Sequence, residues 1–166
     1  LEFRRVLFRS TSEACLDCRP GTVSAKAGLD SCPDCAAGTF QRDKGQTACL
    51  TCSAGHYCEA GASAPLPCPS GRHQNGTMTA LNLSMTSEDD CEVCPAGAFC
   101  STGAAEPTEC SPGTVQPASG QGSCSKCDAG KYQDGQGRTA CFECVAGAYC
   151  ASGASAALPC PSGRHQ

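Results

Sequence analysis

Residues 32–52 read CPDCAAGTFQRDKGQTACLTC, and this stretch decides the fold. It opens with a Cys-x-x-Cys pair, places a Gly three residues after the second Cys and an aromatic ring at Phe40, and returns through a polar, Gly-containing loop to another Cys-x-x-Cys pair. Gly at that position suits a tight turn with positive φ, and the polar loop suits a hairpin bend. The stretch therefore predicts a short hairpin whose ends are tied by cysteines.

The same phrase recurs along the chain. Nine cysteines open a C-x-x-G phrase at spacings of 16 or 17 residues, with one wider spacing of 26. They are Cys18, Cys35, Cys52, Cys68, Cys94, Cys110, Cys127, Cys144 and Cys160. At an offset of 92, residues 18–74 align with residues 110–166 without a gap, and 34 of 57 positions are identical. The pattern indicates an internal duplication of small modules.

Composition favours cross-links over a hydrophobic core. Cysteine supplies 18 of 166 residues, an even number and a density typical of secreted disulfide-bonded domains. Trp and Ile are absent, and Leu, Val and Phe together number only 19. This apolar content is too low to fold a chain alone, and no window has a helical period. We expect a small disulfide-rich fold, an elongated tandem array of short irregular β-hairpin modules with almost no helix.

The simplest disulfide scheme closes each module on itself. It pairs Cys18 with Cys32, Cys35 with Cys49, Cys110 with Cys124, and Cys127 with Cys141. Cys52, Cys58, Cys68 and Cys91 allow three pairings, and the sequence does not choose among them. We favour Cys52 with Cys58, Cys68 with Cys91, Cys94 with Cys100, and Cys144 with Cys150. The scheme leaves Cys15 and Cys160 without partners, as expected if the chain is truncated at both ends.

Two alternating phrases resemble a known family. C-x-x-C-x-x-G-[TK]-[FY], with a Gly-containing loop returning to C-x-x-C, alternates with C-x-x-G-x-[YF]-C-x-x-G across residues 15–166. This alternation resembles the ephrin-receptor-like cysteine-rich repeats and, more distantly, tumour-necrosis-factor-receptor modules and epidermal-growth-factor-like domains. The resemblance implies an extended extracellular stalk or adhesive region of a large surface protein. It does not imply an ephrin ligand, because the ligand-binding domain of those receptors is a separate unit.

We therefore expect a non-enzymatic segment, a structural, adhesive or ligand-display stalk of a larger extracellular or cell-surface protein, with no cofactor. Other proteins or surface glycans are the expected partners. A net charge of −4 at pH 7 argues against nucleic acid. Membrane contact is expected only through an anchor of the parent protein outside these residues.

The alternative is an intracellular zinc-binding cysteine array that mediates protein interaction. Cys15, Cys18, Cys32 and Cys35 have the spacing of a four-thiolate zinc site. The C-x5-C and C-x9-C spacings of later modules and the recurrent Gly turns favour disulfides instead.

Other side chains have less specific interpretations. Three histidines, His56, His73 and His165, are expected to face solvent, and the acidic residues within 88–92 to form a solvated bend without the spacing of a calcium loop. The rings are expected to pack on neighbouring disulfides as small local cores. These rings are Phe40, Tyr57, Phe99, Tyr132 and Tyr149.

The chain divides into four segments. Residues 1–10, LEFRRVLFRS, look like the translation of a sequencing adapter and are treated as a non-native tail. Residues 11–74 hold the first copy of the repeats, and residues 91–166 hold the second, truncated at the C-terminus. Residues 75–90 form an expanded polar loop, and the stretch from Gly71 to Asp90 is expected to be exposed and mobile. Two sequons in that loop predict N-glycosylation at Asn75 and Asn82.

Overall fold

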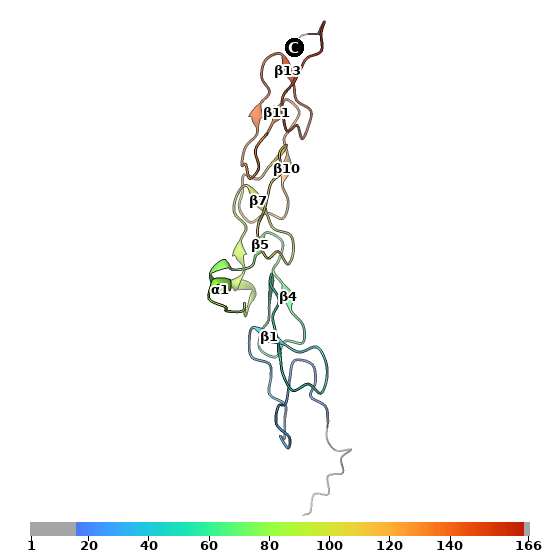
Figure 1. Ribbon diagram of the computed structural model, residues 1–166, viewed down its shortest axis with the longest axis vertical. Helices are drawn as coiled ribbons and strands as arrows, with labels where there is room; N and C mark the ends of the chain where they lie inside the picture. The colour runs from blue at the N-terminus through green and yellow to red at the C-terminus, as the bar shows by residue number, and fades with distance from the viewer. Residues whose placement is uncertain (1–15, 165–166) are drawn as a thin grey trace, which may run out of the picture.

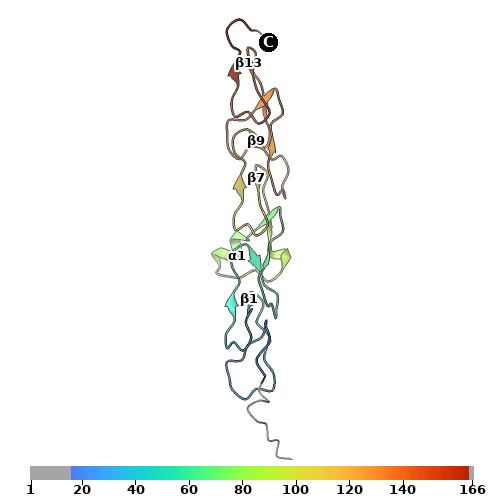
Figure 2. The same cartoon turned by 90° about the vertical axis from the view of Figure 1, so that its right-hand side faces the viewer.

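Two-residue strands pair into seven separate antiparallel hairpins within residues 16–164, the part of the chain that the computed structural model describes. The pairs are β1 (Thr39–Phe40) with β2 (Leu50–Thr51), β3 (His56–Tyr57) with β4 (Leu66–Pro67), β5 (Arg72–His73) with β6 (Glu92–Val93), β7 (Ala98–Phe99) with β8 (Thr108–Glu109), β9 (Thr114–Val115) with β10 (Ser125–Lys126), β11 (Lys131–Tyr132) with β12 (Phe142–Glu143), and β13 (Ala148–Tyr149) with β14 (Leu158–Pro159). The hairpins follow one another along a slender rod, which is narrow in both views (Figures 1 and 2).

Each hairpin begins at the turn that the C-x-x-G phrase encodes. After Cys94, the Ala98 N–H donates to the Pro95 carbonyl at 3.3 Å, and Gly97 holds φ of 84° at the third position of the turn. A positive φ at this position requires Gly or a residue with similar freedom. The turn then directs the next two residues into β7.

Disulfides close the modules. Four of them span 14 residues of sequence: Cys18–Cys32, Cys35–Cys49, Cys110–Cys124 and Cys127–Cys141. Three span 6 residues, and one spans 23: Cys52–Cys58, Cys94–Cys100, Cys144–Cys150 and Cys68–Cys91. These pairs are those of the self-closing scheme. Cys160 is unpaired within residues 16–164, and Cys15 lies outside the described residues.

The core consists mainly of sulfur. Among the described residues, the buried hydrophobic side chains are ten half-cystines together with Met85, Ala98, Val115 and Ala148. Within residues 16–164, helix is limited to one five-residue segment, α1 (Gly76–Ala80), and one 3-10 turn, η2 (Glu88–Asp90). The small disulfide-rich array of hairpins predicted from the sequence is therefore confirmed.

Backbone hydrogen bonds join each module to the next. We name each module by its opening cysteine, and the junction of the Cys94 and Cys110 modules shows the pattern. Its four N–H to carbonyl bonds run from Gly97 to Gln116 (2.7 Å), from Cys110 to Gly97 (2.9 Å), from Gly120 to Cys94 (2.8 Å), and from Cys100 to Gln121 (3.0 Å). The equivalent four bonds recur at the junctions Cys18/Cys35, Cys35/Cys52, Cys68/Cys94, Cys110/Cys127 and Cys127/Cys144. Neighbouring modules therefore dock in one fixed arrangement.

Glycine packing extends these contacts by one further module. A Cβ atom added to Gly97 in the Cys94 module would overlap the carbonyl oxygen of Gly137, which belongs to the Cys127 module two steps along. The same approach occurs between Gly113 and Gly153. The rod therefore has contacts between next-nearest modules, beyond the nearest-neighbour contacts expected from the sequence.

Candidate functional site

The regular array is interrupted at one place, where residues 75–90 extend the Cys68 module. We call residues 75–90 the insertion. It projects from the side of the rod and carries α1 (Figures 1 and 2). Because it departs from the repeat, the insertion is the candidate functional site.

Both sequon asparagines cap α1. The Asn75 side-chain oxygen accepts a hydrogen bond from the Met78 N–H at 3.0 Å, as an N-cap residue does. At the other end, the Leu83 N–H donates to the Met78 carbonyl at 2.8 Å and the Asn82 N–H donates to the Thr79 carbonyl at 3.0 Å. Asn82 has φ of 54° and is the only non-Gly residue with positive φ within residues 16–164. These bonds form a Schellman motif, so α1 is defined at both ends.

Met85 anchors the insertion to the rod. Its side chain is 1% exposed and packs on the Cys68–Cys91 disulfide, with Tyr57 and Met78 alongside. The expectation that the whole loop is exposed is therefore wrong at Met85, and the mobility of the loop stays a prediction. An apolar side chain is more stable when it covers the disulfide than when it faces water.

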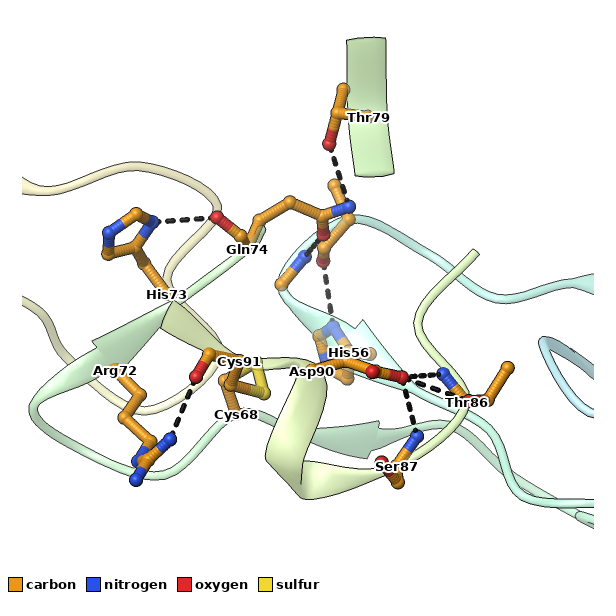
Figure 3. Close-up of a disulfide and its surroundings, with 12 residues drawn as sticks. His56, Cys68, Arg72, His73, Gln74, Thr79, Thr86, Ser87, Asp90 and Cys91 are labelled. Atoms are coloured by element: carbon orange, nitrogen blue, oxygen red, sulfur yellow. Dashed lines mark hydrogen bonds between the residues drawn. A yellow bond between two sulfur atoms is a disulfide. The ribbon is translucent and has the colours of Figure 1, made fainter. Parts of the chain in front are cut away.

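Asp90 organises the end of the insertion (Figure 3). Its carboxylate accepts hydrogen bonds from the Thr86 N–H at 2.7 Å, the Thr86 hydroxyl at 2.9 Å and the Ser87 N–H at 3.1 Å. The backbone hydrogen bond from Thr86 is the main cause that lowers the pKa of Asp90 below its usual 3.8. The predicted solvated bend is correct for the exposed Glu88 and Asp89, and wrong for Asp90.

The junction beside the insertion departs from the four-bond pattern. At Cys52/Cys68, the Gly55 N–H donates at 2.6 Å to the side-chain oxygen of Gln74, where the other junctions use a backbone carbonyl. The Gln74 side-chain amide in turn donates to the Thr79 hydroxyl at 3.0 Å (Figure 3). At the other junctions a Gly of the following module, such as Gly120, donates to the carbonyl of the preceding opening cysteine. Ser84 stands at the position of that Gly here, and among the described residues no N–H of the insertion donates to the Cys52 carbonyl. This junction has two of the four usual backbone bonds.

A cleft of about 250 Å³ lies at this junction. Residues 51–54, His56, Gln74, Thr79 and residues 82–85 line it. The lining includes the hydroxyl-bearing residues Thr51, Ser53, Thr79 and Ser84, and no Asp, Glu, Lys or Arg. The cleft therefore has walls of mixed polar and apolar character, and no carboxylate, ammonium or guanidinium group lines it.

Residues 21–65 match the model of the family described as tyrosine-protein kinase ephrin type A/B receptor-like. The cysteine-rich repeats in this matched stretch are similar to ephrin-receptor-like repeats. No curated protein matches the chain. The family match and the disulfides fit an extracellular cysteine-rich module, of a family that is non-catalytic. Within residues 16–164, no helix has the length and apolar character needed to cross a bilayer.

In these ephrin-receptor-like repeats, the residues of the zinc alternative do not come together. Cys18 and Cys35 belong to two different disulfides, and Cys15 lies outside the described residues. No group of three or more His, Cys, Asp or Glu side chains within residues 16–164 could hold a metal ion. The zinc interpretation is therefore not supported.

The histidines and rings have mostly local contacts. His56 Nδ1 lies 2.9 Å from the Ala54 carbonyl oxygen, and His73 Nδ1 lies 2.7 Å from that of Gln74. His165 lies outside the described residues. Tyr57 packs against the disulfide cluster as expected, whereas Tyr132 packs across its hairpin on Phe142, with ring centroids 5.7 Å apart.

Sequence reasoning missed a set of buried glutamines. Gln133 is 1% exposed; its side-chain amide donates to the Ala140 carbonyl at 2.6 Å, and its oxygen accepts from the Gly135 N–H at 3.0 Å. Gln41 and Gln116 make the equivalent pair of bonds in their own modules. The available signal was a Gln six residues after the opening cysteine in five modules, at Gln41, Gln74, Gln116, Gln133 and Gln166. The signal does not decide burial by itself, since Gln74 at this position is only half-buried. The short-disulfide modules have Cys at that position.

Proposed function

We propose that the repeats form a stiff stalk segment of a larger cell-surface or extracellular protein, with a structural, adhesive or ligand-display role. The observation that carries this proposal is the four-bond junction, which recurs six times in one arrangement. A backbone hydrogen bond contributes about 0.5–1.5 kcal/mol net, so bending a junction breaks several bonds at once. A rod of this kind holds whatever it carries at a set distance from its base.

Partners of the stalk are proposed to be other proteins or surface glycans. The family match supports protein interaction at a coarse level. The insertion is the proposed contact region, since it projects sideways and exposes Leu81 and Leu83, which are 64% and 53% accessible.

Length measurements test the stalk proposal. A longer variant carries one further copy of residues 18–109 inserted after residue 109. The order of modules is preserved in this variant, because Cys18 and Cys110 begin equivalent modules. Small-angle X-ray scattering of the secreted protein should show the maximum dimension increasing about 1.5-fold, in proportion to chain length, whereas a flexible chain would increase about 1.25-fold. The reduced and alkylated chain is the flexible control. Growth at the flexible rate in the oxidised protein would refute the stalk.

The disulfide pairs are also a proposal about the secreted protein. Peptide mapping without reductant should recover the eight pairs, beginning with Cys52–Cys58 and Cys68–Cys91, for which the sequence allows three pairings. Recovery of Cys52 bound to Cys68 would reject the scheme.

We also propose N-glycans on Asn75 and Asn82. The capping bond of Asn75 uses its side-chain oxygen and leaves the nitrogen that carries a glycan, and Asn82 is exposed. Mass spectrometry of tryptic peptides from protein secreted by eukaryotic cells should find both sites modified. Unmodified asparagine at both sites would contradict this.

A further inference from the structure

We infer that the cleft at the Cys52/Cys68 junction holds the first N-acetylglucosamine of a glycan attached to Asn82. The inference rests on the glycosylation of Asn82 proposed above. It adds a binding site for that sugar on the protein itself, at the junction where the backbone bonds are incomplete.

The attachment point is fixed beside the cleft. Asn82 is one of the residues that line it. The Schellman motif holds the Asn82 backbone, with φ of 54°, so the first sugar starts from a defined position next to the cleft. A sugar linked there does not have to cross solvent to reach the cleft, which removes most of the entropic cost of binding.

The chemistry of the cleft suits a neutral sugar. Hydroxyls of Thr51, Ser53 and Ser84 can donate to or accept from sugar hydroxyls. The Cys52 carbonyl, which receives no N–H from the insertion, can accept from a sugar hydroxyl or from the acetamide N–H. Because no acidic or basic side chain lines the cleft apart from His56, a phosphate, a metal ion or a charged peptide finds no counter-charge there.

Asn75 supplies an internal comparison. It caps the opposite end of α1 and does not line the cleft. A glycan on Asn75 therefore projects from the insertion without occupying the junction. The two sites differ in position and share the same helix, so one serves as the control for the other.

The test uses the full chain secreted from eukaryotic cells and trimmed with an endoglycosidase that leaves one sugar on each asparagine. The variant Asn82→Gly removes the sugar and keeps a residue suited to positive φ, and Asn75→Asp removes the other sugar and keeps an N-cap. Hydrogen exchange of residues 52–57 and 83–85 should be about tenfold faster in Asn82→Gly than in the trimmed protein, and unchanged in Asn75→Asp. Complete enzymatic removal of both glycans from the unsubstituted chain should give the same increase.

Two outcomes overturn the inference. One is equal exchange in residues 52–57 with and without the Asn82 sugar, which would mean that the sugar lies in solvent. The other is a secreted protein in which peptide mapping finds Asn82 unmodified. Neither outcome affects the stalk proposal, which depends on the growth of the maximum dimension with repeat number.

Discussion

Gly97 and Gly130 occupy the same turn position with nearly the same backbone, at φ of 84° and 86°, in different surroundings. An added Cβ overlaps the Gly137 carbonyl in the first case and has nothing within 4 Å in the second, because the module two steps along from Gly130 opens at Cys160 and is described only to residue 164. Gly130→Ala should therefore cost only the strain of positive φ, about 1–2 kcal/mol, while Gly97→Ala should cost about 1–3 kcal/mol more through overpacking. Native-state hydrogen exchange of each module measures both. Equal losses would mean that the next-nearest contact contributes nothing.

Gln133 and Gln136 offer a second matched pair in one loop. Gln133→Glu keeps an acceptor for the Gly135 N–H and loses the donor to the Ala140 carbonyl, so it should destabilise the module by about 1–3 kcal/mol. Gln136 is exposed, and Gln136→Glu should change little. The difference should shrink as pH falls, since a protonated carboxyl can donate again. Hydrogen exchange around residue 135 across a pH series tests both points.

These residues also show what the sequence could predict at this scale. The turn glycines were identified because they recur at a constant offset from a cysteine, and the backbone requirement is general. Gln133 and Gln136 stand three residues apart in one polar stretch, and nothing in their chemistry shows that only Gln133 is buried. Its burial depends on the path of a loop that it then holds in place.

At the scale of elements, the insertion should open at acid pH. The pKa of Asp90 is lowered in the folded protein, chiefly by the Thr86 backbone hydrogen bond, so its contribution is present above the unfolded value near 3.8 and is lost as pH falls through the lower folded value. The methyl resonance of Met85, buried beside Tyr57, should move toward its unfolded position over that range. Asp90→Asn should weaken the insertion at neutral pH, whereas Asp89→Asn, at an exposed neighbour, should titrate like the wild type. A Met85 resonance that stays constant through the acid range would contradict this role.

The hairpins were predictable at this scale and the insertion was not. A phrase repeated nine times predicts a shared local structure, because each copy has Gly at the same turn position after its cysteine. The insertion occurs once, so no other copy supports a structural interpretation of it. Its two asparagines were interpreted as glycosylation sites, and nothing in the sequence showed that they also lie at the two ends of a helix. Met85 is one of four large apolar residues in the insertion, and only its packing on Cys68–Cys91 shows that it, and not the exposed Leu81 or Leu83, belongs to the core.

At the scale of the whole molecule, the rod follows from composition. Ten of the buried hydrophobic residues in the described part of the chain are half-cystines, and the large apolar side chains are too few to gather distant modules into a globule. The array stays linear, and each module depends on its disulfide and on its junctions. Contacts between next-nearest modules were not predictable from the sequence. The close approach of Gly97 to the Gly137 carbonyl depends on how the Cys94 and Cys127 modules are stacked on the Cys110 module between them.

Removing one disulfide shows how many neighbouring modules depend on it for stability, with hydrogen exchange as the measurement. Replacing both Cys35 and Cys49 with Ser opens a 14-residue closure, worth about 3 kcal/mol in the chain-entropy model for a loop of this size. Exchange should quicken through the Cys18 and Cys52 modules, which bond to the Cys35 module at Gly21 and Cys58. It should also quicken at Ser84, because Gly38 lies against that side chain, and should stay unchanged beyond residue 110.

The duplication supplies the control for this experiment. Cys127 and Cys141 are the equivalents of Cys35 and Cys49 at the offset of 92, and Gly130, the equivalent of Gly38, has no atom within 4 Å of an added Cβ. Their replacement with Ser should loosen only the Cys110, Cys127 and Cys144 modules, with no effect at the insertion. If Ser84 is unaffected in the first variant, the glycine contact transmits no stability. If protection is lost along the whole chain in either variant, the modules form one cooperative unit and the linear picture fails.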